Sequence, residues 1–272
     1  IVMDGMNVFI LVILLLGFVL FSIVVFYVVE YFYAKLFHKP IFVHFYFSPK
    51  TLTQEQQRIL RHKIAFYNRL SDKKKKHFEH RLATFMANYQ FIAKEDLVLN
   101  DEIKVFIAAT AVKLTFGMRK YLIDVFDKII IYPEPYYSTS NDAWHKGEFN
   151  PRMKAIVFSW KDFLEGYEYH NDNLNLGLHE FAHAIHFQGL KRTDKSSILF
   201  ARNYNAILDY TAQKQVAQKL IESNYFRIYA FSNSFEFIAV LLEHFFETPD
   251  DFRREFPELY EKVRKMINFQ IE

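Results

Sequence analysis

Two histidines stand four positions apart in the segment GLHEFAHA of residues 177–184, with a glutamate directly after the first. On a helix, positions i and i+4 share one face, so His179 and His183 can both present a ring nitrogen to one metal ion. Zinc held in this way lowers the pKa of a bound water, and the neighbouring carboxylate of Glu180 can take that water's proton. This HExxH pattern predicts zinc-dependent hydrolysis of peptide bonds, with Glu180 as the general base.

The flanking sequence favours a helix over about residues 173–188, because apolar residues recur at helical spacing and Asp172 or Asn173 can cap its start. The alternative is a pair of structural histidines beside a surface glutamate. An extended motif would need glycine at 186 and histidine at 189, but the chain has His186 and Gly189. The class of zinc peptidases with that extended motif is therefore excluded. We expect His186 to pack against neighbouring side chains or to contact the metal ligands without binding the metal.

The third metal ligand has to come from a later part of the chain. The candidates are glutamates on later predicted helices, namely Glu222, Glu236 and Glu243. Glu236 and Glu243 lie seven positions apart, on one face of an apolar segment, where a buried carboxylate needs a cation. However, Glu236 could instead close a capping box with Asn233. Glu243 could orient a ligand histidine by contacting the ring nitrogen that does not bind the metal. The spacing leaves this choice open.

The surrounding elements predict an α+β fold that is mostly helical with a small sheet. Helices are expected from Thr53, from Ser71 and over about 101–116, and after the motif over 195–223, 234–247 and 250–270. Residues 129–132 and 155–160 are typical of strands, and we expect the second to be an edge at which an extended substrate adds. No internal repeat or flexible linker divides residues 50–272.

The N-terminal region contains an uncharged apolar run from Val8 to Val29, enough for a helix of about 33 Å against a hydrocarbon core of about 30 Å. No basic residue precedes it and no small-residue cleavage site follows, so we expect an uncleaved anchor over residues 1–30. Residues 31–50, aromatic and basic, are expected to form a juxtamembrane linker, and residues 51–272 one domain. Lysines after the run favour the cytoplasmic side for this domain.

The composition excludes several classes of protein. Hydrophobic residues make up 51% of the 272 residues, with only 7 Gly and 7 Pro, which excludes disorder and low complexity. The absence of cysteine excludes disulfides, thiolate metal sites and thiol nucleophiles. The net charge is +3, and the basic run of residues 73–76 begins an amphipathic helix, where a solvated face is expected. Nucleic acid is therefore not expected as a partner.

Four blocks of the sequence resemble the Mlc titration factor A (MtfA) family of zinc-dependent peptidases. They are residues 107–117, 156–160, the HExxH helix and residues 229–240, and the similarity spans about 52–262. The resemblance implies a zincin-like fold of the gluzincin type and one zinc per chain, held by His179, His183 and Glu236. It also implies that Tyr229 supplies a hydroxyl near the oxyanion. This chain departs from many members at His186, where they have an aspartate.

The motif and the resemblance together predict a membrane-anchored zinc metallopeptidase that acts on a peptide or protein substrate. We expect a single-pass protein of the bacterial inner membrane, with its catalytic domain facing the cytoplasm. Aminopeptidase-like action is implied by the resemblance alone. The alternative is a regulatory protein that sequesters a transcription factor or a membrane partner, with a vestigial or secondary zinc site.

Overall fold

The structure is a computed structural model that describes residues 5–37, 39–138, 142–169 and 171–270. It contains two compact units, residues 1–43 and 44–272. The first unit is dominated by helix α1 (Gly5–Phe37), which by length and composition is apolar enough to cross a membrane once. The helix continues beyond residue 30, so the first part of the segment expected as linker is helical.

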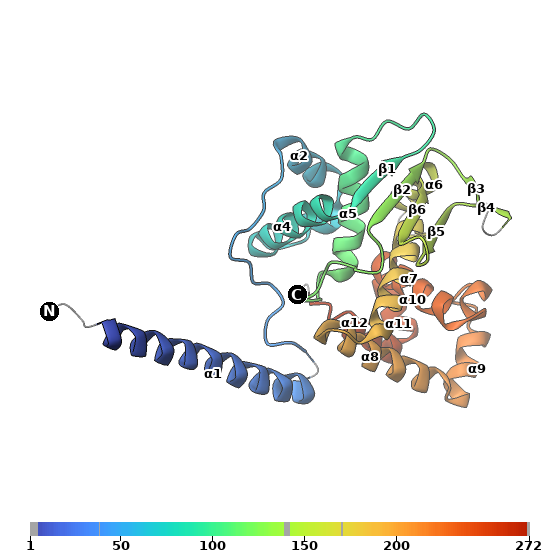
Figure 1. Ribbon diagram of the computed structural model, residues 1–272. Helices are drawn as coiled ribbons and strands as arrows, with labels where there is room; N and C mark the ends of the chain where they lie inside the picture. Colours follow the sequence, from blue (N-terminus) through green and yellow to red (C-terminus); the bar gives the residue numbers. More distant parts are fainter. Residues whose placement is uncertain (1–4, 38, 139–141, 170, 271–272) are drawn as a thin grey trace. The chain divides into compact units, whose positions relative to one another are not determined.

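The second unit is mostly helical, as the sequence predicts (Figure 1). Its helices are α2 (Gln54–Lys63), α3 (Ala65–Asn68), α4 (Asp72–Asn88), α5 (Asp101–Thr115), α6 (Trp160–Glu168), α7 (Leu176–Lys191), α8 (Lys195–Thr211), α9 (Lys214–Glu222), the 3-10 helix η1 (Ile228–Phe231), α10 (Ser234–Glu247), α11 (Pro249–Glu255) and α12 (Pro257–Met266). The single helix expected over 250–270 is divided, because Pro257 cannot continue α11 and instead begins α12.

The main sheet has four strands in the order β1 (Gln90–Ala93), β2 (Lys128–Tyr132), β6 (Ala155–Ser159) and β5 (Gly147–Asn150). The first three are parallel, and β5 is antiparallel to β6. The expectation that residues 155–160 form an edge is wrong, because β6 pairs with a strand on each side. The edge beside it is β5. A separate hairpin pairs β3 (Tyr136–Ser138) with β4 (Ala143–His145).

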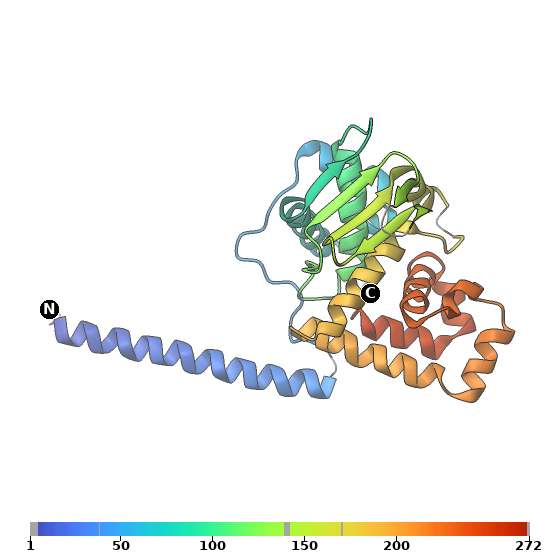
Figure 2. The ribbon, with the colours of Figure 1, turned by 45° about the vertical axis from the view of Figure 1, so that its right-hand side comes forward.

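The two faces of the sheet contribute to different parts of the core. Ile129, Ile131 and Phe158 belong to the main core, which the helices complete. Ile130 and Val157, on the other face, pack in a small cluster with Tyr136 of β3. Figure 2 shows α5 running along one face of the sheet. Helix α7 contacts α5, α6, β5 and β6 on the sheet side and α8 and α10 in the helical region, so it joins both parts of the unit.

Helix α5 begins as expected, since the side chain of Asn100 accepts a hydrogen bond from the backbone of Ile103. Gly117, which closely follows the end of α5, does not have a positive φ. A Cβ at Gly117 would lie 2.1 Å from the carbonyl oxygen of Asn268. Glycine is needed here because the C-terminal segment approaches its backbone closely.

A buried arginine links α4 to the loop after α5. The guanidinium of Arg81 donates to the carbonyl oxygens of Thr115, Phe116 and Met118 at 2.9, 3.1 and 2.8 Å, and its Nε donates to the hydroxyl of Tyr46 at 2.6 Å. The side chain is fully buried. Nothing in the sequence pattern distinguishes Arg81 from other charged residues of the helix.

We expect Arg81→Met to lower the free energy of unfolding by about 3–5 kcal/mol, because three buried carbonyl oxygens lose the charged donor that Arg81 supplies. Urea unfolding of the full chain in detergent micelles measures this change. The matched control is Arg58→Met, whose guanidinium pairs with Glu55 on the exposed surface of α2. The control should unfold at nearly the wild-type urea concentration, and equal shifts in both variants would contradict a structural role for Arg81.

Candidate metal centre

Helix α7 is positioned by its cap and by two glycines. Its N-cap is Asn175, whose side chain accepts a hydrogen bond from Leu178 N at 2.9 Å, so the expected cap at Asp172 or Asn173 is wrong. A Cβ at Gly177 would lie 2.5 Å from the ring of Phe163, and one at Gly189 would lie 2.3 Å from that of Phe200. The helix is therefore packed closely along its length.

One turn of α7 and the first turn of α10 bring three potential ligand atoms together. The Nε2 atoms of His179 and His183 lie 3.1 Å apart, and the carboxylate of Glu236 lies 3.0 Å from the first and 3.6 Å from the second. Donors about 2.0–2.1 Å from a tetrahedral zinc lie about 3.3 Å from one another. The spacing and the donor types thus fit a metal ion, and this group could hold one.

Each of the other carboxylates considered from the sequence has another partner. Glu243, two turns after Glu236 on the same face of α10, contacts Nδ1 of His179 at 3.3 Å, on the side of the ring away from the ligand cluster. Glu222 of α9 accepts a hydrogen bond from Gln218. Within the described part of the chain, neither belongs to the group that could hold a metal.

Asn233 caps the start of α10, but among the described contacts the Glu236 side chain does not close the capping box considered from the sequence. The side chain of Asn233 accepts hydrogen bonds from the backbone N–H groups of Phe235 and Glu236 at 2.9 and 3.0 Å. The Glu236 side chain turns instead to the two histidines. Capping and metal ligation are therefore compatible at this residue.

Arg227 is a residue of the centre that sequence reasoning missed. Its guanidinium donates to the carbonyl oxygen of Asn173 at 2.7 Å and pairs with Glu243 at 2.7 Å. It also lies 3.4 Å from Nδ1 of His179. Arg227 and Glu243 together fix the outer edge of the imidazole, an arrangement that orients a metal-binding histidine. No local motif marks Arg227, because its partners are distant in sequence.

Glu180 is held by the edge strand of the sheet. Its carboxylate accepts a hydrogen bond of 2.8 Å from Phe149 N of β5, and the side chain is buried. A Cβ at Gly147 would lie 2.7 Å from Leu176 and 3.0 Å from Glu180, so glycine permits this close packing. Burial raises the pKa of Glu180 to about 7, which suits a group that takes and returns a proton near neutral pH.

The pKa values of the two histidines are shifted in opposite directions. Burial alone would lower the pKa of His179, but hydrogen bonds to Glu236 and Glu243 outweigh it and raise the pKa to about 10. Burial, helped by the neighbouring His179, lowers the pKa of His183 to about 4. The carboxylates therefore stabilise one positive charge at this point, which is what a cation-binding site requires.

A cleft of about 550 Å³ opens over the centre and is lined by Trp144, Gly147, His179, Glu180 and Tyr229 among others. Tyr229 lies on η1 and is about half exposed, with its ring centre 6.2 Å from that of His179. Burial and the nearby Glu236 raise the pKa of Tyr229 to about 12. Its hydroxyl therefore remains protonated at neutral pH and can donate a hydrogen bond.

His186 lies outside the cluster, in an aromatic surrounding. It is fully buried, with ring centres of Phe235 and Tyr204 at 4.2 and 4.4 Å. Neither ring nitrogen has a hydrogen-bond partner within the described part of the chain. Burial lowers the pKa of His186 to about 4, so it is neutral and packs as an aromatic residue.

The group of two histidines and one glutamate that could hold a metal ion fits a metallopeptidase, and sequence comparison supports that class. The chain belongs to the family of glucose-regulated metallopeptidases M90, whose model matches residues 46–267. The resemblance seen in the sequence is thereby confirmed.

Two relatives show how similar this chain is in sequence to other proteins. The chain is 26% identical over 235 residues to the protein slr2042 of Synechocystis, covering 79% of this chain and 84% of that protein. It is 22% identical over 196 residues to Mlc titration factor A of Yersinia pestis, covering 63% of this chain and 69% of that protein. The same values hold for the protein of that name from Yersinia pseudotuberculosis.

Proposed function

We propose that this chain is a membrane-anchored, zinc-dependent metallopeptidase of the gluzincin type that hydrolyses peptide bonds. The observation that carries this proposal is the convergence of His179, His183 and Glu236 beside the buried carboxylate of Glu180, where a cleft lined by His179 and Glu180 opens. Two imidazoles and one carboxylate suit zinc and leave a position open for water or substrate.

The residues of the chain divide the chemistry among them. A zinc ion, when bound, supplies Lewis acidity that lowers the pKa of the attacking water. Glu180 takes the proton from that water while the water oxygen bonds to the carbonyl carbon. It then delivers the proton to the leaving nitrogen when the C–N bond breaks. Tyr229 donates a hydrogen bond to the carbonyl oxygen as negative charge develops there. Glu243 and Arg227 keep the His179 ring in place.

The edge strand β5 is suited to align an extended substrate over the cleft. It pairs with β6 on one side only, and it contributes Gly147 to the cleft lining. A peptide that added to this edge as a further strand would carry its backbone past Glu180.

Tyr229→Phe removes only the hydroxyl. We expect kcat to fall by about 10- to 100-fold, with KM and zinc content nearly unchanged, because the lost hydrogen bond stabilises the transition state. Steady-state kinetics with metal analysis checks this. Tyr169→Phe, which removes an exposed hydroxyl from the same cleft, is the control. A Tyr229→Phe enzyme with the wild-type kcat would show that this tyrosine has no role at the oxyanion.

The activity itself is tested by digesting a broad peptide library with the full chain and analysing the products by mass spectrometry. New termini within the peptides show endopeptidase action, whereas loss of N-terminal residues alone shows the aminopeptidase-like action that the resemblance implies. A zinc-loaded chain that cleaves nothing would contradict the proposal.

A regulatory role as a binding protein is the second candidate. Relatives of this chain carry the name Mlc titration factor A, which points to a regulatory protein partner. In this chain, apolar side chains are exposed on η1 and α9, namely Ile228, Phe231 and Ile221, and the last two line one hollow. Exposed apolar groups in one region are typical of protein contact surfaces. The zinc site would then be secondary.

We further propose that α1 spans a bacterial inner membrane once, with residues 51–272 as the catalytic domain in the cytoplasm, because Lys35, Lys39 and Lys50 follow the apolar run. Since the chain has no cysteine, single cysteines can report sidedness. Lys63→Cys should react with an impermeant maleimide only after the inner membrane is permeabilised, whereas Asn7→Cys should react in spheroplasts. The reverse pattern would contradict this orientation.

A further inference from the structure

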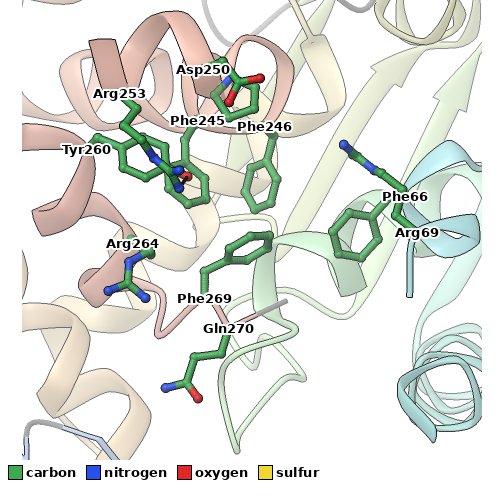
Figure 3. Close-up of a pocket in the computed structure, with 11 residues that line it drawn as sticks. Phe66, Arg69, Phe245, Phe246, Asp250, Arg253, Tyr260, Arg264, Phe269 and Gln270 are labelled. Atoms are coloured by element: carbon green, nitrogen blue, oxygen red, sulfur yellow. Dashed lines mark hydrogen bonds between the residues drawn. The ribbon is translucent and has the colours of Figure 1, made fainter. Parts of the chain in front are cut away.

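A second hollow of about 500 Å³ shares no lining residue with the cleft of the metal centre. It lies among α3, α10, α11, α12 and the segment after α12, and its walls are largely aromatic (Figure 3). Phe245 and Phe246 come from α10 and Tyr260 from α12, while Phe269 and Phe66 complete the lining. The ring centre of Phe245 lies 4.9 Å from that of Tyr260 and 5.2 Å from that of Phe269.

The charged residues of this hollow are mainly basic. Arg69, Arg253 and Arg264 line it, against a single acidic residue, the exposed Asp250. Arg253 stacks on the ring of Tyr260 at 4.7 Å and donates to its hydroxyl at 3.2 Å, so its guanidinium is held in place. Arg264 pairs with Glu261 at 2.8 Å, whereas Arg69 forms no ion pair with any residue that the structure describes.

A further cation lies against one aromatic wall. The ammonium group of Lys113, on α5, is 4.9 Å from the ring centre of Phe246. Burial lowers its pKa to about 8, and attraction to Glu247 only partly opposes this shift. No residue in the described ranges pairs with Lys113 within ion-pair distance. Lys113 therefore adds a cation beside the Phe246 ring.

We propose that this hollow binds a small organic anion that carries a flat aromatic or apolar face. Aromatic walls bury such a face, while guanidinium groups bind a carboxylate or phosphate through paired hydrogen bonds. A neutral aromatic molecule would leave Arg69 without an anion, and an inorganic anion would leave the rings in water. The volume lies within the usual range of small-molecule sites, about 300–1,000 Å³.

The position of the hollow relates it to the metal centre through one helix. Phe245 and Phe246 are at the C-terminal end of α10, the helix that carries Glu236 nearer its start. The next residue, Glu247, accepts a hydrogen bond from Asn175, the cap of α7. A ligand in the hollow would thus contact an element of the metal centre without entering the cleft, and its binding does not depend on peptidase activity.

The proposal is tested by isothermal titration calorimetry of the full chain in lipid nanodiscs, with phenylphosphate as the probe. We expect saturable binding of one molecule per chain with a dissociation constant of about 1 mM or tighter. Inorganic phosphate lacks the ring and benzyl alcohol lacks the charge, so each should bind at least about tenfold more weakly. Absence of saturable binding, or equal binding of inorganic phosphate, would overturn the proposal.

Paired variants locate the site. Arg69→Gln combined with Arg264→Gln should weaken phenylphosphate binding by about tenfold or more, because two charged donors are lost. Arg58→Gln combined with Arg61→Gln removes the same charge from the exposed face of α2, outside the hollow, and should leave the affinity unchanged. Equal weakening in both pairs would mean that only the net charge matters, which contradicts a built site.

Discussion

Replacing Glu180 with glutamine should reduce kcat/KM for peptide hydrolysis by about 100- to 10,000-fold while zinc binding is retained. Glutamine has nearly the same shape and can still accept the hydrogen bond from Phe149 N. It cannot take a proton from the attacking water. Steady-state kinetics and metal analysis on the same full-chain preparations measure both quantities.

The matched control is Glu148→Gln, which neutralises a carboxylate on β5, the strand that donates a hydrogen bond to Glu180. Glu148 accepts a hydrogen bond from Asn150 and does not belong to the group that could hold a metal among the described residues. Its rates should stay within a few-fold of wild type. A Glu180→Gln chain that cleaves peptides at the wild-type rate would show that another group acts as the base.

The second large effect distinguishes the two glutamates of α10. Glu236→Gln should weaken zinc affinity by more than about 100-fold, because a negatively charged ligand is lost from the cluster. Glu243→Gln should weaken it by only about 10- to 100-fold, because this residue acts through the other nitrogen of His179. Competition against a fluorescent zinc chelator measures both constants.

Glu222→Gln on α9 is the control for this series, since its carboxylate contacts Gln218 and not the histidines. Its zinc affinity should equal that of the wild type. If Glu243→Gln lost more affinity than Glu236→Gln, the third ligand would have to be reassigned to Glu243.

Features that depend on neighbouring residues were predictable from the sequence. The capping box of Thr53 with Gln56 is present at the start of α2, and α10 has the bounds expected for residues 234–247. Likewise the i, i+4 spacing on a helix is sufficient to bring Nε2 of His179 and His183 together. Each of these rests on backbone geometry within a turn or two of helix.

Features that depend on tertiary distance were not predictable in this way. Glu236 and Glu243 share one helix face, and only the packing of α10 against α7 decides which carboxylate reaches Nε2 of His179. The four-residue strand β5 has too few residues for a periodic signal, yet it forms the sheet edge and binds Glu180. Arg227 contacts the centre through His179 and Glu243, which are distant from it in sequence.

The most direct test of the account is a titration of zinc into the metal-free full chain, with peptide hydrolysis followed at each addition. The account predicts that hydrolysis rises in proportion to added zinc and stops rising at one equivalent per chain. It also predicts that His183→Ala, which lacks one ligand, gains no activity over this range. If the wild-type chain binds one zinc but hydrolyses no peptide, the peptidase assignment is wrong and the role as a binding protein is favoured.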